Sequence, residues 1–176
     1  HWDVLLIQEG RTSEKEGSKI IGGGHLLYFG IPGPLKRTVG VMLNKRWAEE
    51  PVSFHVRNER IVYLDIDLDC VQMRLTSAHL PHADFPDKHY ESELDALEDA
   101  VCGACQTRRM HIIGVDANAV LGRQELTDDE RIIGRYGGGV RNAQGHLFAP
   151  WLAGQRLTAT ATQIQKPWDS VWTHEL

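Results

Sequence analysis

The sequence predicts an α+β fold or a layered α/β sandwich, and three observations support this class. Short apolar runs rich in Val, Ile, Leu and Tyr recur between polar or glycine-bearing stretches. Two segments have helical spacing, and they stand apart from the strands instead of alternating with them. No internal repeat is visible. Many strands with few, separately placed helices favour a mixed layered fold over a regular βαβ array.

Eight segments are predicted to be strands. The run 61–68 alternates apolar residues with Asp65 and Asp67, which predicts a half-exposed strand with its carboxylates on a solvated face. Asp69-Cys70 then forms a turn into the next strand, giving a hairpin. The eight segments are Asp3–Glu9, Leu26–Gly30, Val39–Asn44, Val52–Val56, Ile61–Leu68, Val71–Leu80, Met110–Val115 and Leu157–Thr162.

The two predicted helices cover His89–Gln106 and Gln144–Ala153. The first has apolar residues at offsets of three and four, ending at Cys105, with acidic residues on its other faces. Gly154 is expected to stop the second helix. The two glycine triplets, 22–24 and 137–139, are predicted to be loops.

Charge is unevenly distributed along a chain that has 19 basic and 24 acidic residues among 176. Residues 83–100 contain seven acids and one base, whereas residues 131–168 contain five bases and no acid. One interpretation is that residues 83–100 form a solvated helix face and that residues 131–168 lack acids by chance. The other is an electropositive wall for a phosphate-bearing substrate.

Several classes of protein are excluded. No apolar run reaches the length of a membrane span, and three cysteines cannot form a disulfide framework. Cys102-x-x-Cys105 lacks the second ligand pair that a zinc site needs. The chain opens at His1 with no methionine and no signal peptide, so we expect a fragment of a longer protein from a reducing compartment.

Three strand ends carry residues suited to phosphate chemistry. Glu9 follows the first apolar run, and a carboxylate held there suits a hard cation such as Mg²⁺. Asp116 and Asn118 follow the strand 110–115, where a carboxylate can accept a proton from water while an amide holds that water. His79 lies at the edge of another strand and has an imidazole that can donate to a phosphate oxygen. Each residue alone has a structural explanation: an exit to solvent, an Asx turn or a local loop hydrogen bond.

In this order, Gln8-Glu9, then His79 near a proline, then Gly114-x-Asp-x-Asn118 resemble the endonuclease/exonuclease/phosphatase superfamily, to which deoxyribonuclease I belongs. The glycine-rich stretch 133–148, with Arg141-Asn142, is similar to a segment of endonuclease domains in non-LTR (LINE-type) retrotransposons. The resemblance spans nearly the whole chain. It implies one deoxyribonuclease I-like domain over residues 1–176, with two packed, mostly antiparallel sheets flanked by helices and incomplete at both ends.

The resemblance also implies roles for individual residues. Glu9 would bind Mg²⁺, for which Mn²⁺ can substitute, and His79 would contact the phosphate. Asp116 would orient or deprotonate the attacking water, and Asn118 would hold the phosphate and that water. Substrate contacts are expected from the following residues: Arg141, Asn142 and Thr162.

The implied activity is Mg²⁺-dependent nicking of target DNA, leaving a 3′ hydroxyl for a reverse transcriptase domain of the same parent chain to extend in the nucleus. The family's N-terminal Asn and C-terminal Ser-Asp-His would lie outside these 176 residues, so we expect the fragment alone to be inactive. Removal of terminal strands also predicts exposed edges and poor solubility. Two alternatives are a phosphoesterase of the same fold acting on RNA, lipid or inositol phosphates, and a non-catalytic nucleic-acid-binding remnant.

Overall fold

The computed structural model describes residues 2–47, 49–68 and 70–165. The chain divides into two compact units, each described by itself below. The first comprises His1–Leu80 and Asp95–Asp116, and the second comprises Pro81–Leu94 and Ala117–Leu176. Within the described ranges, no helix combines the length and the apolar character needed to cross a membrane.

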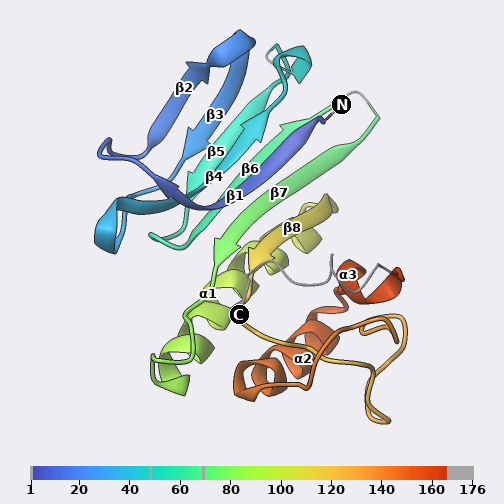
Figure 1. Ribbon diagram of the computed structural model, residues 1–176. Helices are drawn as coiled ribbons and strands as arrows, with labels where there is room; N and C mark the ends of the chain where they lie inside the picture. The colour runs from blue at the N-terminus through green and yellow to red at the C-terminus, as the bar shows by residue number, and fades with distance from the viewer. Residues whose placement is uncertain (1, 48, 69, 166–176) are drawn as a thin grey trace. The chain divides into compact units, whose positions relative to one another are not determined.

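The first unit contains two four-stranded sheets (Figure 1). Both are antiparallel except for one parallel pair, β7 with β8. The first sheet has the order β1 (Val4–Arg11), β4 (Arg37–Leu43), β3 (His25–Phe29) and β2 (Gly17–Ile21). The second has the order β5 (Val52–Val56), β6 (Ile61–Asp67), β7 (Gln72–His79) and β8 (Met110–Asp116). This arrangement confirms the predicted layered α+β class.

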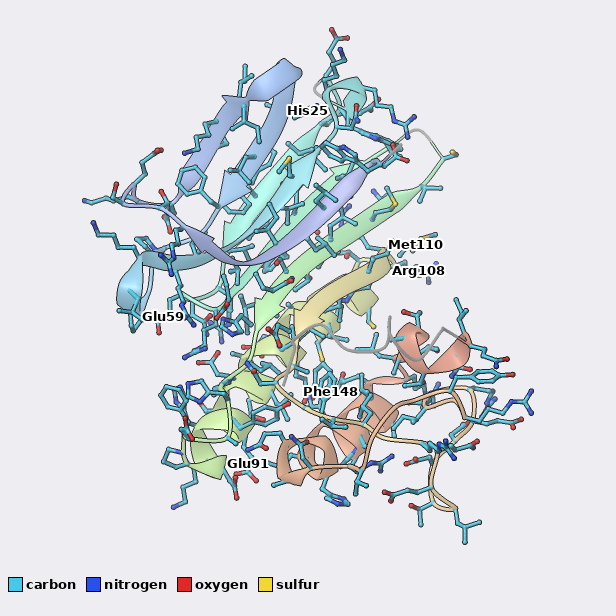
Figure 2. The ribbon with its side chains drawn as sticks, in the orientation of Figure 1. His25, Glu59, Glu91, Arg108, Met110 and Phe148 are labelled. Carbon is cyan, nitrogen blue, oxygen red and sulfur yellow. The ribbon has the colours of Figure 1, made fainter. Side chains whose placement is uncertain are left out.

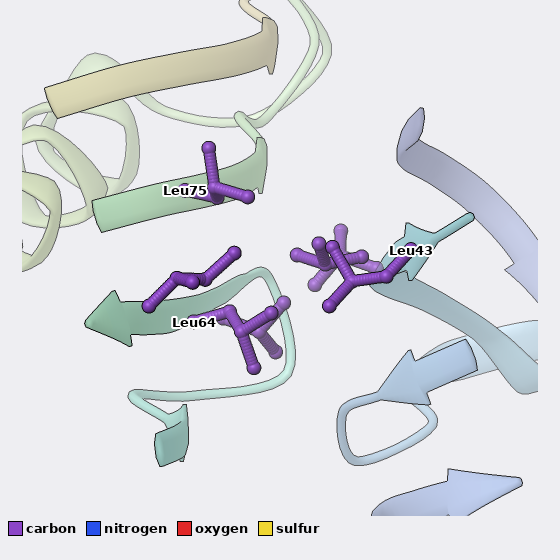
Figure 3. Packing of buried hydrophobic residues seen from close by; sticks show 7 residues of the cluster. Leu43, Leu64 and Leu75 are labelled. Carbon is purple, nitrogen blue, oxygen red and sulfur yellow. The ribbon is translucent and has the colours of Figure 1, made fainter. Parts of the chain in front are cut away.

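The core of this unit lies between the two sheets (Figure 3). Alternate residues of each strand point to one face, so β4 and β6 each present a row of branched aliphatic side chains to the other sheet. Leu75 of β7 extends this cluster, and its members are almost fully buried. The cluster consists of Val39, Val41, Leu43, Val62, Leu64, Ile66 and Leu75.

The opposite face of the second sheet carries a buried ion pair. Arg74 Nε and Nη2 donate to the two carboxylate oxygens of Asp65 at 2.7 and 2.8 Å. Arg74 Nη1 donates to the carbonyl oxygen of Ala100 in helix α1 (Asp87–Gln106) at 2.8 Å. The prediction that Asp65 belongs to a solvated face is therefore wrong, because the helix covers it; Asp67 is exposed as predicted, and Asp69 lies outside the described residues.

The hairpin of β6 and β7 is confirmed, with Leu68 and Val71 exchanging backbone hydrogen bonds at its end. Strand β2 was not predicted, because its sequence Gly-Ser-Lys-Ile-Ile lacks a clear apolar period and the strand forms a half-exposed edge. Three short 3-10 turns were also not predicted: η1 (Gly22–Gly24), η2 (Pro34–Lys36) and η3 (Lys45–Trp47).

The second unit combines loops with α2 (Ala143–Gln155) and α3 (Thr160–Gln163). Phe148, labelled in Figure 2, is buried in α2, and its ring stacks on that of Trp151. Gly154 does not end α2; Arg156 adopts the left-handed conformation that caps it. The predicted strand 157–162 is wrong, because its second half forms α3.

Candidate active site

A β-bulge places Glu9 near the end of β1. Ile7 pairs with Gly40 of β4, whereas Gly10 pairs with Thr38, so β1 has one more residue than its partner over this stretch. Glu9 has a φ of 56°, which is rare for a residue with a side chain. Bulges redirect side chains and occur frequently beside active sites. The residue with the strained backbone here is Glu9, whose carboxylate was predicted from the sequence to bind a cation.

Gln8 and Ser77 hold the backbone of this bulge in place. Gln8 Nε2 donates to Ser77 Oγ of β7 and to the carbonyl oxygen of Gly114 of β8, both at 3.0 Å. Ser77 Oγ donates in turn to the carbonyl oxygen of Ile7 at 2.8 Å. These bonds connect β1 of the first sheet with two strands of the second, so the position of Glu9 is tied to both sheets.

Gly114 allows the two sheets to approach closely at this end. A Cβ atom on this residue would lie 2.5 Å from Cβ of Leu6 in β1, a distance shorter than any van der Waals contact. The neighbour that approaches it is the side chain of Leu6.

His79 and Asp116 end the two parallel strands of the second sheet, and they are register partners. Leu80 N donates to the carbonyl oxygen of Asp116 at 2.9 Å, which extends the pairing beyond the strands. Alternate residues of a strand point to the same face, so His79 shares the face of Ser77 and of the core residue Leu75. Asp116, as the register partner of His79, points to the same face, which is turned toward the first sheet. His79 Nε2 lies 3.9 Å from Glu9 Oε1.

The surroundings of His79 favour the neutral form of its imidazole. Burial lowers its pKa below the ordinary 6.5. The nearby carboxylates of Asp116 and Glu9 oppose this shift, and the cations Arg60 and Arg37 reinforce it. At neutral pH the ring therefore has one N–H donor and one acceptor nitrogen.

Two arginines of this cluster were not predicted from the sequence. Arg37, the first residue of β4, forms an ion pair with Glu9 through Nη1. Arg60 Nη1 donates to the carbonyl oxygen of His79 at 3.3 Å. Neither arginine belongs to a recognisable motif; the register of β1 against β4 brings Arg37 to Glu9, and that register is not readable from local sequence.

The remaining predicted residues belong to the second unit. Asn118 lies two residues beyond β8 and has a φ of 46°, so the alternation of a strand does not extend to it. Asn142 caps α2: its Oδ1 accepts from Gly145 N at 2.8 Å and from Val120 N at 2.9 Å. Thr162 lies in α3, not at a strand end, and its Oγ1 accepts from Gly134 N at 2.7 Å.

Arg141 is a buried structural cation within this unit. Its Nη2 lies 2.6 Å from Asp128 Oδ2, its Nη1 lies 3.5 Å from Glu125 Oε2, and its Nε donates to Leu121 O at 2.8 Å. Arg131 likewise pairs with Asp129. The acid-free stretch 131–168 is thus partly neutralised by acids that directly precede it, which weakens its interpretation as an electropositive wall.

Cys102 and Cys105 of α1 are free and exposed, so the assignment of Cys105 to the apolar stripe of the helix is wrong.

The candidate cation ligand is Glu9. In the part of the chain that the structure describes, no three His, Cys, Asp or Glu side chains gather into a metal-binding group. Mg²⁺ commonly takes one or two protein carboxylates and completes its shell with water and phosphate oxygen. Glu9 fits this pattern: its carboxylate is half-exposed and already holds a cationic group, Arg37.

Comparison with solved structures finds a similar fold in the endonuclease domain of TRAS1, a telomere-specific non-LTR retrotransposon. The TM-score is 0.58 and the sequence identity 16%. The match covers 87% of this chain and 58% of the other, so this chain spans less than two thirds of that domain. The likeness shows that the two chains share a fold. No protein-family model matches the chain, and no curated protein gives a significant match.

Proposed function

We propose that this chain is part of a metal-dependent DNA endonuclease of the retroelement type. The observation that carries the proposal is the convergence of Glu9, His79 and Asp116 at one end of the two-sheet sandwich. Their residue types match the needs of phosphodiester hydrolysis: a cation ligand, a neutral hydrogen-bond donor and a carboxylate base. The similarity of the fold to a retrotransposon endonuclease domain supports the same conclusion.

Each side chain has a distinct task in the proposed reaction. Asp116 accepts a proton from the attacking water as the water oxygen bonds to phosphorus. The bond from phosphorus to the 3′ oxygen breaks, and that oxygen takes a proton from solvent to become a 3′ hydroxyl. The neutral ring of His79 donates its N–H to a non-bridging phosphate oxygen.

Glu9 would hold the divalent cation, which we take to be Mg²⁺ with Mn²⁺ as a substitute. When bound, such a cation supplies positive charge beside the oxygens of the attacked phosphate. The bulge and the hydrogen bonds of Gln8 fix the backbone at Glu9. Binding of the cation would therefore require little further ordering of this backbone.

Asn118 is proposed to hold the phosphate and the attacking water. Arg141, Asn142 and Thr162 are proposed to border the DNA. Because their side chains are engaged inside their own unit, they would act by fixing the shape of the surrounding loops. A reverse transcriptase domain in the same parent chain, working in the nucleus, would use the 3′ hydroxyl.

Nicking of supercoiled plasmid in Mg²⁺ tests the proposal. Because residues 1–176 alone are expected to be inactive, rates are compared within the longest reading frame that encodes them. Asp116→Asn should lower the nicking rate by about 10²–10⁴-fold, the usual contribution of a general base, and EDTA should abolish nicking. Asp95→Asn is the matched control, since Asp95 is an exposed acid on α1. Equal rates for wild type and Asp116→Asn would remove Asp116 from the mechanism.

Three substrates distinguish a DNA endonuclease from the alternative functions. Plasmid DNA, single-stranded RNA and bis-p-nitrophenyl phosphate are compared under the same conditions. Cleavage of the small diester or of RNA, with intact plasmid, would replace the DNA endonuclease with another phosphoesterase of this fold. DNA binding without any cleavage in the longest reading frame would indicate a non-catalytic remnant.

A further inference from the structure

The ion pair between Arg37 and Glu9 occupies the oxygen atom that the proposed function assigns to a divalent cation. Nη1 of Arg37 bonds to Glu9 Oε1, the same oxygen that lies 3.9 Å from His79 Nε2. Both side chains are 41% exposed, so water reaches the pair and either partner can rotate away. A half-exposed pair of this kind adds little to stability, which suggests a role other than holding the fold together.

The register of the first sheet explains why Arg37 turns to Glu9. Arg37 is the direct partner of Arg11 across the antiparallel pair of β1 and β4, and like charges in that position repel. Lys36, the preceding residue, adds a third basic group. The extra residue of the bulge brings the Glu9 carboxylate to Arg37, where it offsets this local excess of positive charge.

We propose that Arg37 is the resident counter-cation of Glu9 and that it exchanges with the divalent ion on this carboxylate. When the ion binds, the guanidinium is displaced and becomes available to a phosphodiester oxygen. A guanidinium suits that second partner, since its planar fork matches the oxygens of phosphate as well as those of a carboxylate. The inference rests on the proposed function, in which Glu9 is the cation ligand.

Exchange predicts that one substitution moves two affinities in opposite directions. In Arg37→Gln the ion no longer competes with a guanidinium, so the affinity for Mn²⁺ should rise about two- to fivefold, the equivalent of a half-exposed ion pair. The affinity for a short duplex oligonucleotide in the presence of Ca²⁺ should fall, because the displaced cation is missing. Arg37→Lys retains the charge and should remain close to wild type in Mn²⁺ affinity.

The probes are Mn²⁺ alone, followed by electron paramagnetic resonance, and a fluorescein-labelled duplex followed by anisotropy. Both measurements use residues 1–176, so neither depends on cleavage. Arg57→Gln is the matched control, because Arg57 forms an exposed ion pair with Asp99 elsewhere in the first unit. The melting temperature of each variant shows that it is folded at the temperature of measurement.

The outcomes separate this inference from the proposed function. If Glu9→Gln abolishes Mn²⁺ binding while Arg37→Gln leaves the Mn²⁺ affinity unchanged or weakens it, exchange is wrong and Glu9 remains the cation ligand. If Glu9→Gln leaves Mn²⁺ binding unchanged, the cation role of Glu9 fails and exchange fails with it. A rise in Mn²⁺ affinity together with a fall in oligonucleotide affinity, seen in Arg37→Gln and absent in Arg57→Gln, supports exchange.

Discussion

Stability should fall between pH 6.5 and pH 4 because His111 is buried in a neutral form. This residue of β8 is the register partner of Arg74 in β7, and its Nε2 lies 2.7 Å from Thr76 Oγ1. Its Nδ1 is buried and has no hydrogen-bond partner among the described residues. Burial, reinforced by the positive charge of Arg74 and opposed by Asp65, lowers its pKa from 6.5 to about 4.

The direction of this pH effect follows from how readily the folded and unfolded states bind a proton at His111. Below pH 6.5 the unfolded chain protonates this histidine, whereas the folded chain does so only near pH 4, so acid favours the unfolded state across this window. The contribution of His111 to the free energy of unfolding is complete above pH 6.5 and is lost as the pH falls to about 4. At 1.36 kcal/mol per pKa unit, the loss is about 3 kcal/mol.

The test is urea unfolding of wild type and His111→Gln at pH 7.5 and pH 4.5. Acid also protonates carboxylates in both proteins, so the quantity to compare is the difference between their losses. Wild type should lose about 2–3 kcal/mol more than His111→Gln on going to the lower pH. His55→Gln, a change at an exposed histidine of β5, is the control. Equal losses in wild type and His111→Gln would refute the assignment of a neutral buried His111.

Five further outcomes are expected, all measured on residues 1–176. Gly114→Ala should destabilise by about 1–3 kcal/mol in urea, because the new Cβ would meet Leu6; Gly154→Ala, in open space on α2, should instead stabilise by about 1 kcal/mol. Asn142→Ala should cost about 1–2 kcal/mol through loss of the α2 cap, and no change in melting temperature would contradict the capping role. Arg74→Met removes the nearer guanidinium from the buried carboxylate of Asp65, leaves only Arg109 Nε at 3.6 Å, and should cost about 3–5 kcal/mol. Ile112→Lys, at a position 46% exposed on edge strand β8, should raise solubility in a precipitation assay without lowering the melting temperature.

The last of these outcomes bears on the expected poor solubility. β8 and β1 each end a sheet, so each has one edge without a strand partner among the described residues. Met110 projects from the beginning of β8 (Figure 2) and is 54% exposed. Apolar side chains on an open edge favour association between chains, and a charge placed there opposes it.

The sequence alone determined the strands and helices with strong periodicity, and it determined which residues stand at their ends. Local patterns suffice for this, since alternation and helical spacing are properties of neighbouring residues. Glu9, His79 and Asp116 were identified in this way, and the resemblance to the endonuclease/exonuclease/phosphatase superfamily predicted that they share one site.

Tertiary structure decided what each side chain contacts. The sequence pattern predicts a solvent-facing Asp65, but helix α1, which follows later in the chain, covers it and Arg74 neutralises it. Arg141 reads as a free cation, but Asp128 binds it. Arg37 has no sequence signature, and only the register between β1 and β4, with its bulge, brings it to Glu9. Such contacts depend on strand pairing and on packing between segments far apart in the chain, which no local pattern encodes.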